Sequence, residues 1–174
     1  MTSRERLGFH PGAFIVNKRA LIDKIIAHLA AELELATRAA RAAHAESTHE
    51  QSKADNKYDT RGLEASYLAH GQARQAAEIG EAILRFESLA ARPLATPNAV
   101  DLGALVEVDC RGARTLYFIG PGAGGTEIEL DNQEVLVLTP ASPLGRQLLG
   151  RRPGDRVKTE LAGARQEFRV TAVS

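Results

Sequence analysis

The chain has 174 residues, of which 44% are hydrophobic and 25% charged, and its net charge is zero. This composition is typical of a globular protein with one ordinary domain or two small ones. The balanced charge excludes a strong general field for nucleic acid, because that binding needs clustered lysines and arginines. No run approaches 18 apolar residues, so we expect no membrane-spanning segment and no membrane partner. The single cysteine, Cys110, excludes an intrachain disulfide and is expected to be a buried thiol in a reducing cytoplasm.

Residues 21 to 89 carry the pattern of two long helices joined by a polar segment. In the first helix, apolar or small residues recur at spacings of four and three, at Ile22, Ile26, Leu29, Leu33, Ala36, Ala40 and Ala43. A second series consists of Ala65, Leu68, Ala76, Ile79, Ile83, Phe86 and Ala90. Because neither series is stable when exposed, we predict an antiparallel hairpin that is slimmest at its alanine-rich far end. About 26 residues at 1.5 Å rise give an arm roughly 40 Å long.

The limits of the two helices follow from local signals. Asn17 is a candidate cap for the first helix, which we expect to end near Ala45. The second helical pattern runs from residue 63 to residue 91 and contains Gly71 and Gly80. Each glycine costs about 1 kcal/mol relative to alanine in a helix, so we expect a packing reason for both.

Pro93 and Pro97 end the helical part, and short strands separated by glycine turns follow. The expected strands are residues 104–109, 115–119, 126–130, 134–138, 156–161 and 167–173. Ser142 and Pro143 have the form of a helix N-cap followed by proline at the first helical position, and Gly150 ends that short helix.

The sequence therefore predicts an α+β protein with two parts. Residues 1–96 are expected to form a lead segment and an antiparallel coiled-coil hairpin. Residues 97–174 are expected to form an antiparallel β domain with one short helix. Each part has its own series of apolar residues, so we expect each to have its own core.

Three segments of the carboxyl-terminal part carry a family resemblance: SPLGRQLLG at residues 142–150, the turn at residues 153–155, and the strand at residues 167–170. Together with the order of hairpin, proline linker and β domain, they resemble the bacterial Gre family of transcript elongation factors. The resemblance implies an FKBP-like carboxyl-terminal fold that docks on RNA polymerase beside its secondary channel. It also implies a coiled coil that enters the channel toward the catalytic centre.

Gre cleavage factors carry an acidic signature, D-x-x-[ED]-N-x-x-[YF], at the hairpin tip. The nearest stretch here is SKADNKY at residues 52–58. Asp55 and Asn56 match the second acid and its asparagine. Ser52 stands in the place of the first acid, and Tyr58 stands one residue early.

The resemblance also implies what this tip does. RNA polymerase hydrolyses RNA with two divalent cations, the second held weakly, and Mg²⁺ prefers oxygen ligands. Asp55 is expected to share this transient Mg²⁺ with the polymerase, with Asp59 or Glu50 as the second acid. Tyr58 is the candidate aromatic for stacking on a base or on a polymerase helix. The chain would then be no enzyme itself and would bind no cofactor tightly. The alternative for these residues is a solvated polar loop.

The leading prediction is a monomeric, cytoplasmic elongation factor that binds RNA polymerase and stimulates cleavage of backtracked RNA. Its contact with the nascent RNA is expected to be indirect. The candidate docking residues are Arg146 and Leu144, although Leu144 and Leu148 at i, i+4 also fit a core position. One alternative is a modulator or inhibitor that occupies the channel without stimulating cleavage. Another is a coiled-coil adaptor unrelated to polymerase.

Overall fold

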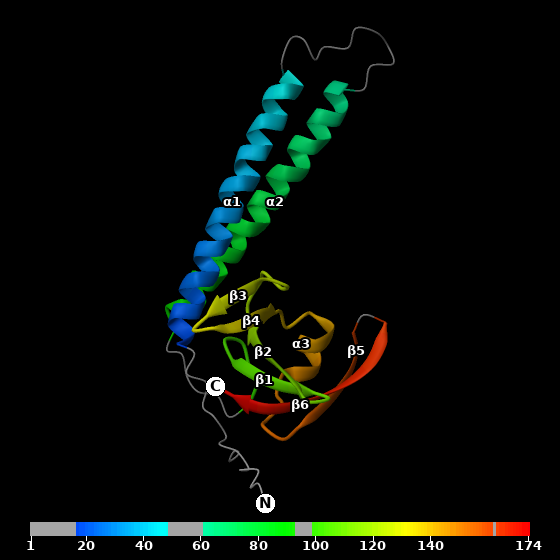
Figure 1. Ribbon diagram of the computed structural model, residues 1–174. Coiled ribbons are helices and arrows are strands. Elements are labelled where there is room, and N and C mark those ends of the chain that lie inside the picture. Colours follow the sequence, from blue (N-terminus) through cyan, green and yellow to red (C-terminus); the bar gives the residue numbers. More distant parts are fainter. Residues whose placement is uncertain (1–16, 49–60, 93–98, 162) are drawn as a thin grey trace, which may run out of the picture.

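The structure, a computed structural model, describes residues 17–48, 61–92, 99–161 and 163–174 (Figure 1). Two long helices form a hairpin that stands on a β domain, which confirms the predicted α+β class. The helices are α1 (Lys18–Thr48) and α2 (Arg61–Ala90). The β domain contains β1 (Leu105–Cys110), β2 (Ala113–Ile119), β3 (Glu127–Leu130), β4 (Gln133–Leu138), α3 (Pro143–Leu148), β5 (Arg156–Leu161) and β6 (Ala164–Val173).

The base of the hairpin is closed by hydrogen bonds at the ends of both helices. Asn17 caps α1 as predicted, because its side-chain oxygen accepts from the N–H groups of Arg19 and Ala20 at 3.0 and 3.2 Å. The Arg19 guanidinium donates to the carbonyl oxygen of Ala90, the last residue of α2. The start of α1 is therefore tied to the end of α2. At its other end, α1 continues to Thr48, beyond the predicted end.

The predicted seam is correct near the base and wrong in the far half of α2. Leu68 is 55% exposed, although the series placed it inside. The step from Leu68 to Ala76 covers eight residues, which turns the stripe by about 80° around the helix. A groove of about 800 Å³ lies between the helices in this half, so the expected slim end is not observed. The side chain of Ala65 lies outside the described part of the chain.

Gly71 and Gly80 do not have the packing role that we expected. A Cβ atom at either position would meet no heavy atom within 4 Å. Neither glycine is therefore required by a close contact within the described part of this chain.

The six strands form one sheet in the order β3-β4-β2-β1-β6-β5. The predicted antiparallel pairing is correct for every pair except β2 and β4, which run parallel with Leu116 beside Val135. The difference follows from the connection after β2. The loop at residues 120–126 carries the chain past the position of β4 to the sheet edge, and the β3–β4 hairpin then returns into the gap.

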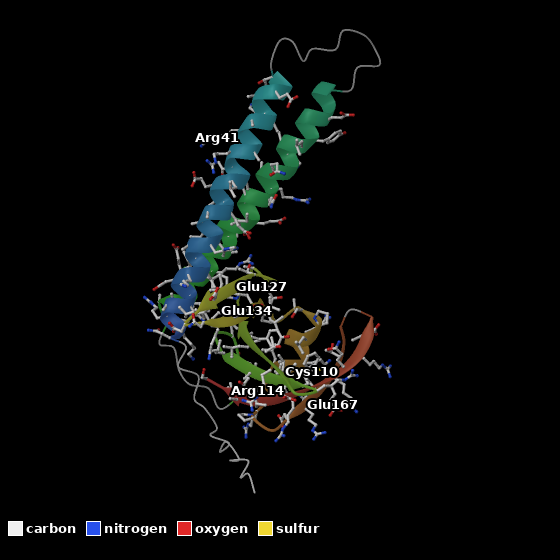
Figure 2. The ribbon with its side chains drawn as sticks, viewed as in Figure 1. Arg41, Cys110, Arg114, Glu127, Glu134 and Glu167 are labelled. Carbon is white, nitrogen blue, oxygen red and sulfur yellow. The ribbon has the colours of Figure 1, made fainter. Side chains whose placement is uncertain are left out.

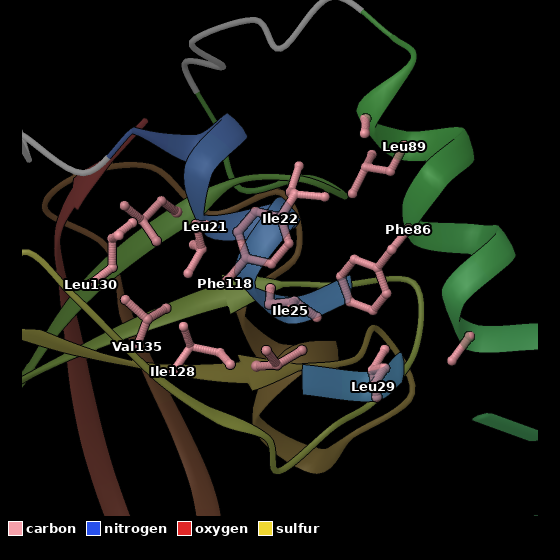
Figure 3. Close-up of a cluster of buried hydrophobic side chains, with 14 of the residues drawn as sticks. Leu21, Ile22, Ile25, Leu29, Phe86, Leu89, Phe118, Ile128, Leu130 and Val135 are labelled. Atoms are coloured by element: carbon pink, nitrogen blue, oxygen red, sulfur yellow. The ribbon is translucent and has the colours of Figure 1, made fainter. Parts of the chain in front are cut away.

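The sheet has an apolar core on each face. The hairpin-side core lies between one face and the base of the hairpin (Figure 3). It contains Leu21, Ile22, Ile25, Leu29, Ala82, Phe86, Leu89 and Ala90 from the helices, with Leu105, Leu116, Phe118, Ile128, Leu130, Val135 and Val137 from the sheet. The α3-side core on the other face contains Val100, Ala104, Val106, Val108, Tyr117, Ile119, Leu144, Leu148, Val157, Phe168 and Val170.

The hairpin and the sheet therefore share one core, and the expectation of a separate core for each part is wrong in this respect. Phe86 of α2 stacks on Phe118 of β2, with ring centroids 6.5 Å apart. Gly120 lies beside this pair, and a Cβ atom there would be 2.9 Å from the Phe86 ring and from Val137. The domain boundary predicted between residues 96 and 97 lies outside the described residues and stays a prediction.

The short helix α3 forms as predicted. The Ser142 hydroxyl accepts a hydrogen bond from the N–H of Gly145 at 3.0 Å and donates to the carbonyl oxygen of Thr139 at 2.8 Å. Pro143 occupies the first turn, and Gly150 follows the helix with a φ of 75°. This cap holds Leu144 and Leu148 in the α3-side core.

Replacing Gly145 by alanine should destabilise the protein by about 1–3 kcal/mol. The new Cβ atom would collide with the backbone oxygen of Thr139 and lie 2.7 Å from the Ser142 hydroxyl, so α3 would have to leave its cap. Urea unfolding measures the loss. Gly71→Ala is the matched control and should raise stability by up to about 1 kcal/mol. Wild-type stability of Gly145→Ala would contradict the packing described for α3.

Phe86→Ala should cost about 3–5 kcal/mol, because the ring is fully buried where the hairpin meets the sheet. Circular dichroism should show a loss of helix, and hydrogen exchange should show faster amide exchange in β2. Both changes should occur together in the variant. Leu84→Ala is the control, since Leu84 is 65% exposed on the same helix and should change stability by less than about 0.5 kcal/mol. Loss of the helices with unchanged exchange in β2 would show that the core is not shared.

Candidate functional site: the hairpin arm and the α3 surface

The predicted tip residues Glu50, Asp55, Tyr58 and Asp59 lie outside the described residues. The flanking helices nevertheless define where the tip is attached. α1 ends at Thr48 and α2 begins at Arg61, at the end of the hairpin farthest from the sheet (Figure 1). The segment that carries the four predicted tip residues therefore connects the helices at the far end of the arm.

The arm projects well beyond the core that holds it. Leu29 is the last α1 residue in the hairpin-side core, and α1 continues from there for about 28 Å at 1.5 Å per residue. Near the base, the Lys24 amino group also donates to the carbonyl oxygen of Glu129 in β3, at 2.9 Å. The base is thus anchored at the sheet while the rest of the arm stands free of it.

Ion pairs along the outside of the arm support its helical conformation. Three of them join residues four apart on one helix: Glu34–Arg38 at 3.7 Å, Arg74–Glu78 at 3.6 Å and Glu81–Arg85 at 2.9 Å. The His28 ring lies 3.5 Å from the Glu32 carboxylate at the same spacing. Exposed pairs of this kind contribute only about 0.3–0.5 kcal/mol each. Together they favour a helical arm beyond the part that packs on the sheet.

The two candidate docking residues lie in different environments. Arg146 is exposed on α3, whereas Leu144 is only 2% exposed and packs in the α3-side core. Of the two alternatives for Leu144, the structure has the core position. Its burial follows from the i, i+4 spacing with Leu148, which places both leucines on the sheet side of α3. Of the two candidate docking residues on α3, Arg146 is the one whose side chain is exposed.

Arg146 belongs to a basic region that sequence reasoning did not single out. Residues 146–169 contain seven lysines and arginines but three acids, and all seven basic side chains are exposed. Because the whole chain has zero net charge, the remaining part is acidic by the same amount. The excess of basic residues in this segment can be counted in the sequence, but the zero net charge of the whole chain concealed it.

Glu167 partly neutralises this region on the β5–β6 hairpin (Figure 2). Its carboxylate lies 3.0 Å from the Arg156 guanidinium and 3.4 Å from the Lys158 amino group. The hydrogen bond from Arg156, followed by the one from Lys158, holds the pKa of Glu167 below its usual value. The carboxylate therefore stays ionised at neutral pH and offsets one of the two positive charges beside it.

Two further sequence expectations concern single features of the chain. Cys110, at the end of β1, is half-buried rather than fully buried, and its sulfur lies 3.8 Å from the side-chain oxygen of Gln166.

In the described ranges, no three histidine, cysteine, aspartate or glutamate side chains are grouped as metal ligands. No helix in the same ranges is long and apolar enough to cross a membrane.

Comparison with known proteins assigns the β domain. Residues 95–174 match the family model described as transcription elongation factor, GreA/GreB, carboxyl-terminal domain. No curated protein matches the chain.

Similar solved structures include the GreA factor homolog 1 (Gfh1) of Thermus thermophilus, with 23% identity over 90% of this chain and 94% of that chain and a TM-score of 0.36. Gfh1 of Thermus aquaticus has 25% identity over 88% and 92% of the two chains, with a TM-score of 0.35. The GreA/GreB factor of Nitrosomonas europaea has 16% identity over 64% and 92%, with a TM-score of 0.34.

The assignment rests on the match of the β domain, which includes the capped helix α3 and the closing strand β6. The β domain therefore belongs to the GreA/GreB carboxyl-terminal domain family of transcription elongation factors.

Proposed function

We propose that this protein binds RNA polymerase, inserts its hairpin into the secondary channel and stimulates cleavage of backtracked RNA. The observation that supports this most is the shared core between the hairpin and the family's β domain. Because the arm is packed on the domain that docks, docking also sets the direction of the arm. In this role the protein acts in the cytoplasm as a monomer, has no active site of its own, and meets the nascent RNA only through the polymerase.

The tip residues supply the chemistry in this proposal. Asp55, with Asp59 or Glu50, would hold a weakly bound Mg²⁺ together with the polymerase, since carboxylate oxygens are ligands that Mg²⁺ prefers. That cation supplies activation of the water that attacks the RNA. Tyr58 would stack beside the reacting strand or on a polymerase helix. These roles rest on residue type and on the attachment of the tip at the far end of the arm.

A second candidate is a factor that occupies the channel without stimulating cleavage. The observation in its favour is Ser52, which stands where the family signature has its first acid and offers no carboxylate. The geometry of the arm serves both functions equally. The adaptor alternative is disfavoured by the family of the β domain.

Docking is proposed to use the part of the basic region that lies at α3, and not its members on the strands β5 and β6. Arg146 is its exposed residue on α3, and Arg151 and Arg152 follow directly after the helix. An acidic surface on the polymerase would be complementary to this region, and attraction of this kind weakens as salt concentration rises.

Arg146→Glu should weaken binding to core RNA polymerase by about tenfold at low salt, because it replaces attraction by repulsion at the proposed surface. Fluorescence-anisotropy titration measures the affinity. Arg169→Glu is the matched control: Arg169 is also exposed, but it alternates with Phe168 and Val170 and therefore faces the opposite side of the sheet. Equal binding by Arg146→Glu, Arg169→Glu and wild type would rule out this docking surface.

The wild-type protein should stimulate RNA cleavage in a stalled, backtracked elongation complex. Asp55→Asn keeps the shape of the side chain and removes its charge, so binding should persist while cleavage falls at least about tenfold, as even an outer-shell change at a metal site can cause. Added Mg²⁺ should restore part of the activity. Asp59→Asn and Glu50→Gln, measured separately, identify the second acid.

Two outcomes of this assay would contradict the proposal in different ways. Wild-type protein that binds polymerase but stimulates no cleavage would favour the channel-occupying alternative. Full activity in the Asp55→Asn/Asp59→Asn/Glu50→Gln triple variant would exclude the carboxylate mechanism while leaving cleavage stimulation in place.

A further inference from the structure

The contact between the hairpin and the sheet is confined to the base of the arm. Leu29 of α1 and Ala82 of α2 are the buried members of the hairpin-side core that lie nearest the far end. Among the strands, β3 has the most close backbone contacts with α1. This strand is one edge of the sheet, so one side of its backbone has no neighbouring strand. The hairpin therefore meets the sheet over a short length, and α1 does so mainly at an edge strand.

A cavity of about 720 Å³ begins where this core ends. Leu29 and Glu32 of α1 and Glu78 and Ala82 of α2 line it, together with the loop and strand residues 123–127. Protein interiors restrain motion through close packing, and that packing is interrupted here between the arm and the loop. Apolar contacts therefore hold the arm at its base but do not restrain the turns that follow.

Lys24 attaches α1 to the edge strand at a point outside the apolar contact. Its amino group donates a hydrogen bond to the backbone carbonyl oxygen of Glu129 in β3, at 2.9 Å. In the sequence Lys24 stands between Ile22 and Ile25, which are both buried in the hairpin-side core, but its own side chain is exposed. A helix that is held at two separate points rotates less freely than one held by its apolar face alone. The bond from Lys24 thus restrains the tilt of the arm.

The length of the arm magnifies any change of tilt at its base. About 36 Å of helix separate Lys24 from Thr48 at 1.5 Å per residue. A rotation of about 10° at Lys24 would therefore move Thr48 by about 6 Å. In catalysis, a misplacement of about 1 Å can lower a rate about a hundredfold. A tip that acts at a catalytic centre consequently requires a well-defined tilt at the base.

We propose that Lys24 is a positioning residue that sets the tilt of the arm through the carbonyl oxygen of Glu129. The inference rests on the proposed function, because it concerns how accurately the tip is placed at the polymerase centre. Loss of the bond would leave docking by the β domain intact and reduce the fraction of bound protein whose tip is placed for cleavage. A residue that only stabilised the fold would lower binding and cleavage together.

The test compares three substitutions on α1. Lys24→Met removes the donor and keeps a long side chain of similar helix propensity. Lys24→Arg is the conservative variant, because it retains a donor at the same place. Arg38→Met is the matched control, since it also removes one positive charge from an exposed position of α1, where Arg38 pairs with Glu34 of the same helix. Circular dichroism and the urea midpoint should equal the wild-type values for all three.

The first measurement is the tilt in the free protein. Nitroxide labels on Ala45→Cys in α1 and Gln133→Cys in β4, in a Cys110→Ser background, report the distance between arm and sheet by electron paramagnetic resonance; both label positions are exposed. Wild type, Lys24→Arg and Arg38→Met should give the same narrow distribution, whereas that of Lys24→Met should be broader by about 5 Å. Equal distributions for Lys24→Met and wild type would overturn the inference, whether or not the protein acts on polymerase.

The second measurement is RNA cleavage in a backtracked elongation complex. Lys24→Met should lower the maximal cleavage rate about tenfold and change the concentration for half-maximal stimulation by less than about twofold. Lys24→Arg should recover most of the rate, and Arg38→Met should match wild type. An unchanged maximal rate in Lys24→Met would overturn the inference. If wild type stimulates no cleavage but Lys24→Met broadens the distance distribution, the proposed function fails and the control of tilt by Lys24 is supported.

Discussion

The contact between Phe86 and the sheet is the constraint on which the arrangement of this protein depends. The ring stacks on Phe118 and packs over Gly120, where even a methyl group would be too close. Leu21, Ile22 and Ile25 complete the contact from α1. Burial of large apolar side chains at this junction, with the Arg19–Ala90 hydrogen bond beside it, fixes the base of a long arm to one face of the sheet.

The hairpin junction does not cover the two surfaces for which functions are proposed. The hairpin covers one face of the sheet and α3 covers the opposite face, so the basic region around Arg146 is not obstructed by the arm. In the described part of the chain, the β domain does not cover the far half of the arm, and the segment with the predicted tip acids follows that half in the sequence. If the β domain docks on a partner and the hairpin extends into it, the two parts need a rigid connection. The shared core supplies that connection.

Much of this fold follows from local sequence patterns. The caps at Asn17 and Ser142, the limits of most strands and the heptad series near the base of the hairpin all depend on residues close in sequence. The parallel pair β2–β4 and the shared core depend on which distant elements meet, and the pattern of Leu21 and Ile25 did not reveal that they face a sheet rather than a helix. The length of the arm was predictable from the length of the helical patterns. For Leu144, the sequence left a docking position and a core position open, and tertiary packing decided between them.

The most direct test of the central claim is the position of the hairpin on its partner. Electron cryomicroscopy of the protein bound to a backtracked elongation complex would give that position. The account predicts the β domain at the rim of the secondary channel, the arm inside it and the tip at the catalytic centre, with the hairpin held on the sheet as in the free protein. A hairpin outside the channel, or one detached from the sheet at Phe86, would contradict it.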